Sequence, residues 1–422
     1  SVGYEDKPGV ILQAHMDMVC EKAHDSNHDF EKDPIELKFD GDYMYANKTT
    51  LGADDGIGLA TALALLEDED VKHPNLEVVI TTSEETGMDG AIGFDKSLLK
   101  GQYMINIDSD EEGFLTASSA GGTEGKFYLD VERGPINPNN TKTYEIDLRG
   151  LKGGHSGAQI ANIHVNAIKL AFDILEKIRI KVPFSLVKFD SGTKHNAIPN
   201  SAEIHLVVEN ENENLLLNVF EEVKSEIIEN NLKREPDIEI SIKEENREFK
   251  VAITENSFKK VNSLVQLIPH GVNTMNDEMD IPESSDNLAI IHVDNSGLEG
   301  IVSLRSSNYE RLEELKNKIN ENIEYLGGKI EFNQGYPGWE FREESKLREV
   351  IVKAYKKVTG EDMVVNGIHA GLECGLFAEA LPDLDIVSLG PNLYDIHTIN
   401  ERASLSSIDR IYKTLVETLK DM

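Results

Sequence analysis

Short apolar runs separated by helix-like stretches are the feature that most limits the fold of this 422-residue chain. Residues 10–14 (VILQA), 76–82 (LEVVITT) and 103–107 (YMINI) each have the pattern of a buried parallel strand. Residues 56–66 (GIGLATALALL) are long enough for a buried helix, and Asp54 and Asp55 precede them as candidate caps. The pattern predicts an α/β fold with a largely parallel sheet flanked by helices. The same style returns later, with a helix expected over 346–358, a strand over 385–389 and a helix over 407–420.

The middle of the chain, from about residue 126 to residue 334, has stricter strand alternation and more highly charged helices. Its first part reads as strand, helix, strand, strand, helix, strand, which is the order of a ferredoxin-like unit. A similar order follows over residues 249–332, with helices near 255–267 and 309–326. We therefore predict an α/β domain of residues 1–122 and 335–422 that carries an inserted α+β domain, residues 123–334, of duplicated ferredoxin-like pattern. The elements of the first repeat are expected at 143–148, 163–178, 184–189, 202–208, 213–229 and 237–242.

The formal net charge of −35 restricts the classes of partner. Nucleic acid and anionic membranes are disfavoured, because their phosphates would be repelled. Most of the charge is expected on solvated surface, where it maintains solubility. No run approaches the roughly 18 apolar residues of a membrane span, and no signal peptide is visible. Cys20 and Cys374 cannot form a disulfide framework, which indicates a reducing compartment and a cytoplasmic protein.

Polar side chains follow the predicted strands at the points where the strands end. His15 and Asp17 come directly after the first strand. Ligands of open parallel sheets bind beyond the carboxyl ends of the strands, so His15 is well placed for a site. Asp17 could orient the imidazole by a hydrogen bond. Taken alone, the pair is better explained as a capped or surface histidine.

Four further segments have the same placement, and they contribute Asp54 and Asp55, Glu84 and Glu85, Asp108, and His397. For Asp55 simple capping is the favoured interpretation. Adjacent glutamates repel each other unless a cation lies between them. Each segment alone is better explained as a loop or a cap, but together they put two histidines and several carboxylates on one rim. Such mixed ligands suit zinc, manganese or cobalt better than calcium or magnesium, and a carboxylate shared by two ions roughly 3.5–4 Å apart would form a cocatalytic pair.

These segments resemble, in order and spacing, the aminoacylase and glutamate-carboxypeptidase superfamily of two-metal peptidases. Within it, the chain is most similar to the dipeptidases that split carnosine-like and other Xaa-His dipeptides. The resemblance covers essentially the whole chain. It rests on LQAHMDMV (12–19), HDFEKDPI (28–35), TTLGADDGIG (49–58), TSEETGMDGA (82–91), NIDSDEEG (106–113), KGGHSG (152–157), KHNAIP (194–199) and HAGLECG (369–375).

The resemblance implies two divalent metal ions, zinc first and manganese or cobalt as alternatives. Asp54 would bridge them, with His15 and Asp108 completing one site and Glu85 and His397 completing the other. Residues 1–122 and 335–422 would be the catalytic domain, and residues 123–334 would be a domain that the family uses as a lid or for dimerisation.

The resemblance also implies catalytic and substrate-binding residues. Glu84 would be the general base, with Asp17 behind the first histidine ligand. In the inserted domain, His155 would support the developing oxyanion. Asn196 and Arg305 would hold the substrate, Arg305 by the C-terminal carboxylate. Without the resemblance, His155 could equally be an incidental loop histidine, and Arg305 would be taken for a surface arginine.

The expected function is hydrolysis of Xaa-His dipeptides by attack of a metal-bound water. The expected partner is thus a small peptide substrate, and the protein is expected to be a monomer or a homodimer. The lid of simpler relatives dimerises and sends its histidine into the partner's site, so whether His155 acts within its own chain stays open. Relatives carry a segment before the first metal-binding strand, and this chain, which opens at Ser1 without Met, is expected to lack it.

Three alternatives remain open. The nearest is another superfamily peptidase or amidohydrolase, such as a tripeptidase, a broad dipeptidase or an aminoacylase. The second is a non-enzymatic metal-binding protein, against which an intact Glu84 weighs. The third is a serine hydrolase that uses Ser156, although no nucleophile elbow surrounds this serine. His369 is expected close to the site without an assigned role.

Overall fold

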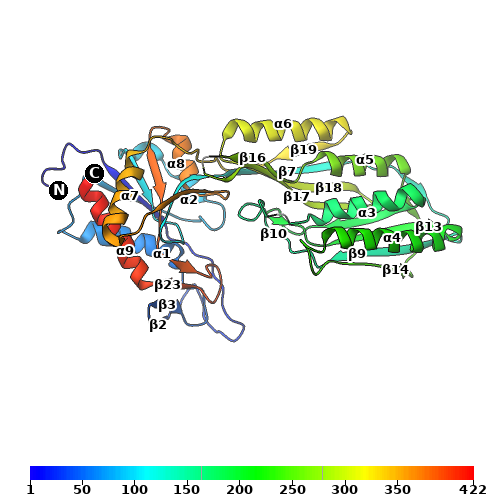
Figure 1. Cartoon of the computed structure of the whole chain (residues 1–422), viewed down its shortest axis with the longest axis horizontal. Helices are drawn as coiled ribbons and strands as arrows, with labels where there is room; N and C mark the ends of the chain where they lie inside the picture. Colours follow the sequence, from blue (N-terminus) through cyan, green and yellow to red (C-terminus); the bar gives the residue numbers. More distant parts are fainter. Residues whose placement is uncertain (163, 278) are drawn as a thin grey trace. The chain divides into compact units, whose positions relative to one another are not determined.

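The structure, a computed structural model, describes residues 1–162, 164–277 and 279–422 and consists of two compact units (Figure 1). Unit 1 comprises Ser1–Ala120 and Pro337–Met422, and unit 2 comprises Gly121–Tyr336. The chain therefore leaves unit 1 once and returns to it once. The sequence predicts the two breaks after residues 122 and 334.

A six-stranded sheet forms the centre of unit 1, in the order β20-β6-β21-β5-β1-β4. β1 pairs in parallel with β4 and β5, and β5 pairs in parallel with β21. β6 and β20 are parallel to each other, and β6 is antiparallel to β21. The carboxyl ends of the four parallel strands therefore share one edge of the sheet. The strands are β1 (Val10–His15), β4 (Leu76–Thr81), β5 (Tyr103–Asn106), β6 (Phe114–Ser119), β20 (Val364–Ile368) and β21 (Asp385–Ser388), which confirms all four strands expected here.

Helices cover both faces of this sheet. Successive strand residues point to opposite sides, so these apolar strands present apolar side chains on both faces. Leu12 packs in one cluster with Leu65, Ile351 and Leu415, which belong to α1, α7 and α9. Its neighbour Ile11 packs on the other side, in a cluster that includes residues of α2 and α8. The helices are α1 (Ala53–Glu67), α2 (Asp89–Gly93), α7 (Lys346–Thr359), α8 (Cys374–Ala380) and α9 (Leu405–Asp421), with a 3₁₀ turn at Lys96–Leu98. The three helices expected for this unit are thus confirmed as α1, α7 and α9.

A small antiparallel sheet of unit 1, in the order β2-β3-β23-β22, was not expected from the sequence. Its strands are β2 (Leu37–Asp40), β3 (Tyr43–Ala46), β22 (Leu393–Tyr394) and β23 (Arg402–Ser404). Ala46 of β3 and Ala403 of β23 pack with Leu51 and Ala53 at the start of α1. This packing fixes the loop of residues 395–401, between β22 and β23, beside the first turn of α1.

Unit 2 is built on one nine-stranded sheet in the order β14-β9-β13-β11-β17-β18-β7-β19, with β16 paired to β17. Its described strand pairs are antiparallel. The strands are β7 (Gly121–Leu129), β9 (Thr141–Arg149), β11 (Ser185–Ser191), β13 (Ala202–Glu209), β14 (Glu239–Glu245), β16 (Gly271–Asn276), β17 (Ile281–Asp294), β18 (Gly297–Ser306) and β19 (Lys329–Phe332). Two short pairs lie outside it, β8 (Arg133–Pro135) with β15 (Val251–Ile253) and β10 (Gly154–His155) with β12 (Ala197–Ile198).

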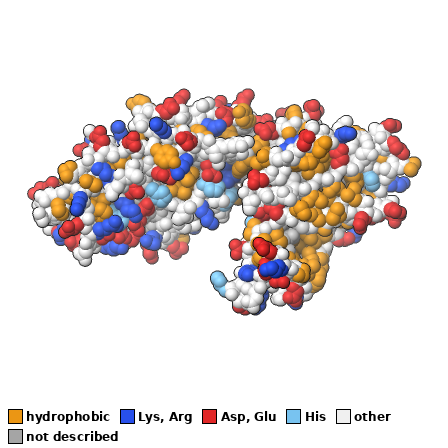
Figure 2. Space-filling view, turned by 180° about the vertical axis from the view of Figure 1, so that it is seen from behind, with side chains coloured by type: hydrophobic (Ala, Val, Ile, Leu, Met, Phe, Trp, Pro, Cys, Tyr) orange, Lys and Arg blue, Asp and Glu red, His pale blue; other side chains and the backbone are white. Residues whose placement is uncertain are grey.

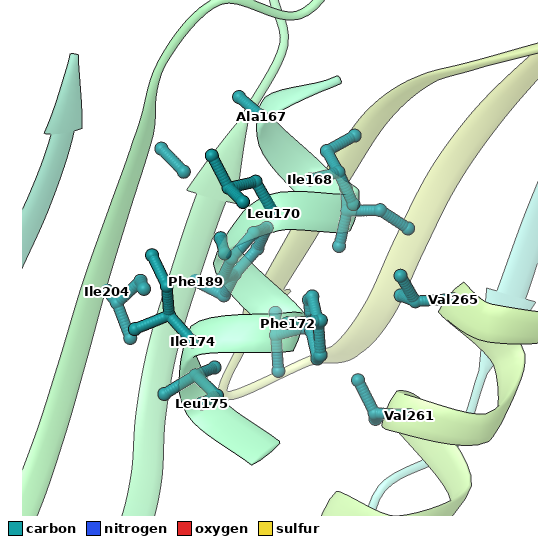
Figure 3. Packing of buried hydrophobic residues seen from close by; sticks show 14 of the residues in the cluster. Ala167, Ile168, Leu170, Phe172, Ile174, Leu175, Phe189, Ile204, Val261 and Val265 are labelled. Carbon is teal, nitrogen blue, oxygen red and sulfur yellow. The ribbon is translucent and has the colours of Figure 1, made fainter. Parts of the chain in front are cut away.

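Four helices, α3 (Ala167–Lys181), α4 (Glu213–Asn231), α5 (Glu255–Leu267) and α6 (Tyr309–Tyr325), contribute to one core against this sheet, and a 3₁₀ turn at Asn210–Asn212 precedes α4 (Figure 1). The ring centroids of Phe172 and Phe189 lie 4.8 Å apart in this core, and Val261 of α5 belongs to the same cluster (Figure 3). The helix expected from Ile163 starts on a residue outside those described. α3 begins at Ala167, because the Asn166 side chain caps it by accepting the N–H groups of Ile168 and Lys169.

The second expected repeat differs from the observed sheet in one respect. The segment near residue 249 was expected to supply its first strand, but β15 pairs with β8 outside the nine-stranded sheet. The strand beside β18 is instead β7, which precedes the first repeat in sequence. A sequence pattern indicates where strands occur, but pairing across so long a separation depends on tertiary packing.

Charge is widely spread over the surface. On the face that Figure 2 shows, Asp and Glu side chains are dispersed, with Lys and Arg between them. This distribution agrees with the expectation that most of the negative charge is solvated. Among the described residues, the helices include none with the length and apolar character needed to cross a membrane.

Candidate metal centre

Unit 1 brings the five expected ligands together at the carboxyl edge of its sheet. His15 ends β1, and its Nε2 lies 3.1 Å from Asp54 Oδ1 and 3.5 Å from Asp108 Oδ1. The other oxygen of Asp54, Oδ2, lies 3.1 Å from His397 Nε2. That same nitrogen lies 3.1 Å from Glu85 Oε1. The carboxylate of Asp54 therefore presents one oxygen to each histidine, which is the arrangement that a bridging ligand requires.

Backbone contacts orient the first of these imidazoles. His15 Nδ1 lies 3.0 Å from the carbonyl oxygen of Asp17, which can only accept, so Nδ1 donates and Nε2 is directed at the carboxylates. The carboxylate of Asp17 is 3.5 Å from the same Nδ1. It also accepts the N–H of Glu84 at 3.1 Å and of Glu85 at 3.2 Å. Asp17 therefore supports the loop of the two glutamates as well as His15.

Asp55 acts as the expected cap and has a second contact. Its carboxylate accepts the N–H of Gly58 at 3.1 Å, and Asp54 and Asp55 have non-helical backbone angles within the first turn of α1. It also accepts the N–H of His15 at 3.2 Å and is only 2 % exposed. Asp55 thus ties the start of α1 to the end of β1.

The electrostatics of the cluster indicate a shortage of positive charge. Burial, together with the charge of Asp108, raises the pKa of Glu84 to about 8. Burial also raises the pKa of Asp108 to about 7 and that of Asp55 well above its usual range. Burial opposes the charged form of His15, but hydrogen bonds to Asp108 and Asp54 raise its pKa to about 12. Carboxylates crowded in this way favour protons or cations between them.

The donor set fits a metal ion. Within the described residues, one ligand atom from each of His15, Asp55 and Asp108 lies within 4.8 Å of the others, and the same holds for His15, Asp54 and Glu85. Imidazole nitrogens combined with carboxylate oxygens are the ligands that zinc and similar ions take. The side chain of His397 is 45 % exposed, so this side of the cluster is accessible to solvent.

A buried polar network beneath the cluster was missed from the sequence. Glu373 accepts hydrogen bonds from Gln13 Nε2 at 2.7 Å and from Thr81 Oγ1 at 2.6 Å. Asn106 Nδ2 donates to Gln13 Oε1 at 2.6 Å. Polar residues inside otherwise apolar strands were the available signal, because a buried polar side chain needs a partner. His369, expected near the site, is buried directly after β20 of the same unit.

Unit 2 holds the three residues expected to contact substrate. His155 in β10 pairs with Ala197 of β12, and Asn196 O accepts the N–H of Ser156 at 2.9 Å. The ring Nδ1 of His155 accepts the N–H groups of Gly157 and Ala158 at 3.2 and 3.1 Å. The ring proton of the neutral imidazole is therefore on Nε2, which leaves this nitrogen as a donor.

Neighbouring groups of unit 2 influence this histidine. Burial, followed by electrostatic interactions with Arg305 and His195, lowers the pKa of His155, which favours the neutral ring. Arg305 Nη1 donates to the hydroxyl of Tyr336 at 2.6 Å. Within the described part of the chain, Arg305 Nε is buried without a hydrogen-bond acceptor. A guanidinium with an unused donor suits a carboxylate ligand.

Ser156 does not have the surroundings of a nucleophile. It is 2 % exposed, and the Nδ1 of the neighbouring His155 is engaged by backbone N–H groups. A serine nucleophile needs an adjacent base and access to substrate. The geometry therefore disfavours the serine hydrolase alternative.

Comparisons with known proteins find a peptidase family and several similar proteins. Residues 11–421 match the model of peptidase family M20/M25/M40. The chain is 34 % identical over 427 residues to the cytosol non-specific dipeptidase of Escherichia coli, covering 100 % of this chain and 87 % of that protein. The crystal structure of aminoacylhistidine dipeptidase from Vibrio alginolyticus matches with a TM-score of 0.92 and 34 % identity, over 100 % of this chain and 86 % of that one. An aminopeptidase from Bacillus cereus shares the fold, with a TM-score of 0.50 and 17 % identity over 100 % and 82 % of the chains.

Proposed function

The chain belongs to the peptidase family M20/M25/M40, and on this basis we propose that it is a metal-dependent dipeptidase whose preferred substrates are Xaa-His dipeptides. The observation that carries the proposal is the carboxylate of Asp54, which faces His15 with one oxygen and His397 with the other. The similarity to a non-specific dipeptidase and to an aminoacylhistidine dipeptidase, both at 34 % identity over the whole chain, supports a dipeptide substrate.

In the proposed centre, five side chains would hold two divalent ions. His15 and Asp108 would hold one ion, Glu85 and His397 would hold the other, and Asp54 would contribute to both. Zinc is the proposed metal, since imidazole and carboxylate ligands suit it, with manganese and cobalt as alternatives. When bound, such ions lower the pKa of water and polarise a carbonyl group.

Glu84 is the proposed general base. It removes a proton from the attacking water and later delivers one to the leaving amine. Its carboxylate is held next to the ligands, because Asp17 accepts the N–H groups of both Glu84 and Glu85. Asp17 therefore has a positioning role for the base in addition to its expected role behind His15.

The residues of unit 2 are proposed to act on the substrate. His155 Nε2–H donates a hydrogen bond to the oxyanion that develops on the scissile carbonyl. Such a bond can lower the activation free energy by about 3 kcal/mol. The backbone contacts of Nδ1 support this tautomer. Arg305 binds the free C-terminal carboxylate and Asn196 assists it, which favours short peptides over chains that extend beyond the second residue.

The architecture of unit 2 has a proposed origin in duplication. Two sets of four strands lie side by side in this sheet, in the orders β14-β9-β13-β11 and β19-β7-β18-β17. In each set, the strand that comes last in the chain lies at the sheet edge, and the first, third and second strands follow it inward. We propose that the sheet is a fused pair of ferredoxin-like units and that residues 123–334 serve as a lid. A cytoplasmic location and a monomeric or homodimeric state are part of the same proposal.

A substrate panel tests the proposed function. The protein is reconstituted with Zn²⁺ or Mn²⁺ and assayed with Xaa-His dipeptides, other dipeptides, tripeptides and N-acetyl amino acids. The proposal predicts the highest kcat/KM for Xaa-His dipeptides and a large loss when the C-terminal carboxylate is converted to an amide. Faster hydrolysis of tripeptides or of N-acetyl amino acids would replace it by the corresponding alternative.

A further inference from the structure

Glu401 makes an unusual set of contacts with the backbone that carries Asp54. It is 2 % exposed, and its two carboxylate oxygens are directed at consecutive backbone amides. Oε2 accepts the N–H of Leu51 at 2.7 Å and of Gly52 at 3.1 Å. Oε1 accepts the N–H of Ala53 at 2.8 Å, with the N–H of Asp54 at 3.5 Å. One buried carboxylate thereby binds the whole segment that leads into Asp54.

Glu401 also belongs to the loop that carries His397. Its own N–H donates to Thr398 O at 3.2 Å, and the Thr398 hydroxyl donates to Asp395 O at 2.7 Å. The backbone N–H of Asn400 donates to that hydroxyl at 3.1 Å. These bonds make residues 395–401 a closed turn in which His397 has a φ of 63°. The side chain of Glu401 therefore joins this turn to the backbone of residues 51–54, beside the contact between His397 and Asp54.

The segment that receives Glu401 has little freedom to adjust. Gly52 has a φ of 70°, and a Cβ at this position would lie 2.7 Å from Met18 Sδ. Charge-assisted bonds from backbone amides to a carboxylate are among the stronger hydrogen bonds in proteins. The free energy of the bonds from Leu51, Gly52 and Ala53, the three shortest of the four, opposes any shift of Asp54 relative to His397.

We propose that Glu401 is a positioning residue that sets the distance between Asp54 and His397 and thereby the affinity for the ion these two residues share. This inference rests on the proposed function, in which both residues are ligands. Partners that orient a ligand typically contribute 10–100-fold in metal affinity. The loss in the absence of Glu401 is expected at the ion held by Asp54 and His397, because the opposite side of the cluster is fixed by other contacts, those of Asp55 with His15 and Gly58.

The test compares Glu401→Gln with a matched control, Glu77→Gln. Glu77 is also a carboxylate of unit 1 that accepts backbone N–H groups, those of Lys100 and Gly101, but it lies near the amino end of β4. Metal-free proteins are titrated with Zn²⁺ alone by calorimetry, and their thermal unfolding is recorded without metal. We expect two ions in the wild type and in E77Q, and a roughly 10–100-fold weaker second ion in E401Q.

The outcomes separate the two proposals. A wild type that binds no pair of ions contradicts the proposed function itself. A wild type with two ions and an E401Q protein of unchanged affinity for both overturns only the role of Glu401. If E401Q does not fold, Glu401→Asp is titrated instead, since it keeps the charge but is one methylene too short to reach all the amides. An aspartate variant with wild-type affinities would also overturn the inference.

Discussion

Glu84 has the most specific task of any single residue in the proposed reaction, and its replacement by glutamine removes that task alone. Glutamine keeps the size of the side chain but cannot take a proton from water. We expect Glu84→Gln to lower kcat by about 10²–10⁴-fold, the usual contribution of a general base. The zinc content, measured on the same preparation, should equal that of the wild type. A variant that holds both ions and keeps the full rate would contradict the assignment of Glu84.

His270 of unit 2 provides a prediction for the pH dependence of stability. Burial, followed by the charge of Lys169, lowers its pKa from 6.5 to about 4. Its Nδ1 faces Asn166 Nδ2 at 3.2 Å, as expected of a neutral ring. The unfolded chain therefore takes up a proton at higher pH than the folded one. The contribution of the neutral His270 to the free energy of unfolding is therefore fully present above pH 6.5 and is lost as the pH falls toward 4.

The change is measured as a difference between two proteins, since many carboxylates titrate in the same range. Between pH 7 and pH 5, the free energy of unfolding of the wild type should fall by about 2 kcal/mol more than that of His270→Gln, as the pKa difference requires. Urea unfolding of both proteins at the two pH values gives this quantity. Equal losses in both proteins would show that His270 does not titrate in this way.

At the scale of elements, the start of α1 has two glycines with opposite surroundings. A Cβ on Gly58 would lie 2.3 Å from Asp55 Oδ1 and 2.4 Å from the carbonyl oxygen of Ile107, next to Asp108. A Cβ on Gly56 has no neighbour within 4 Å among the described residues. Gly58 therefore permits the close approach of α1 to the segment after β5, whereas Gly56 does not have this task.

Alanine substitutions should separate the two positions. Gly56→Ala is expected to raise the free energy of unfolding by about 0.5–1 kcal/mol, because alanine is favoured over glycine inside a helix. Gly58→Ala is expected to lower it by about 1–3 kcal/mol, the usual range for overpacking, and to weaken zinc binding by displacing Asp55 and Asp108. Chemical unfolding and zinc titration measure both effects. Stabilisation by Gly58→Ala would contradict this account of how α1 packs.

The elements also show which parts of the fold were predictable. The strands β1, β4, β5 and β21 have continuous apolar runs, so the sequence predicted them together with α1, α7 and α9. The small sheet of β2, β3, β22 and β23 was missed, because its strands are short and partly exposed. Local patterns cannot reveal pairing between β3 and β23, which are far apart in sequence.

The candidate metal site was predictable where its residues lie beside elements with a clear sequence pattern. His15 and Asp108 lie at the ends of recognisable strands, and Asp54 lies at the start of a recognisable helix, so their convergence could be derived from the parallel sheet. The roles of Glu373 and Glu401 could not be derived. Glu373 acts through side chains of two strands, and Glu401 acts through backbone amides about 350 residues earlier in the chain, as its bonds to Leu51 and Ala53 show. Only the folded chain shows such contacts.

For the whole molecule, the central claim is that two ions at one centre in unit 1 enable peptide hydrolysis. The most direct test is to add Zn²⁺ stepwise to the metal-free protein while the hydrolysis of an Xaa-His dipeptide is followed. The account predicts no activity without metal, activity that appears as the centre fills, and saturation at two equivalents of Zn²⁺. Full activity of the metal-free protein, or saturation at a single equivalent, would contradict it.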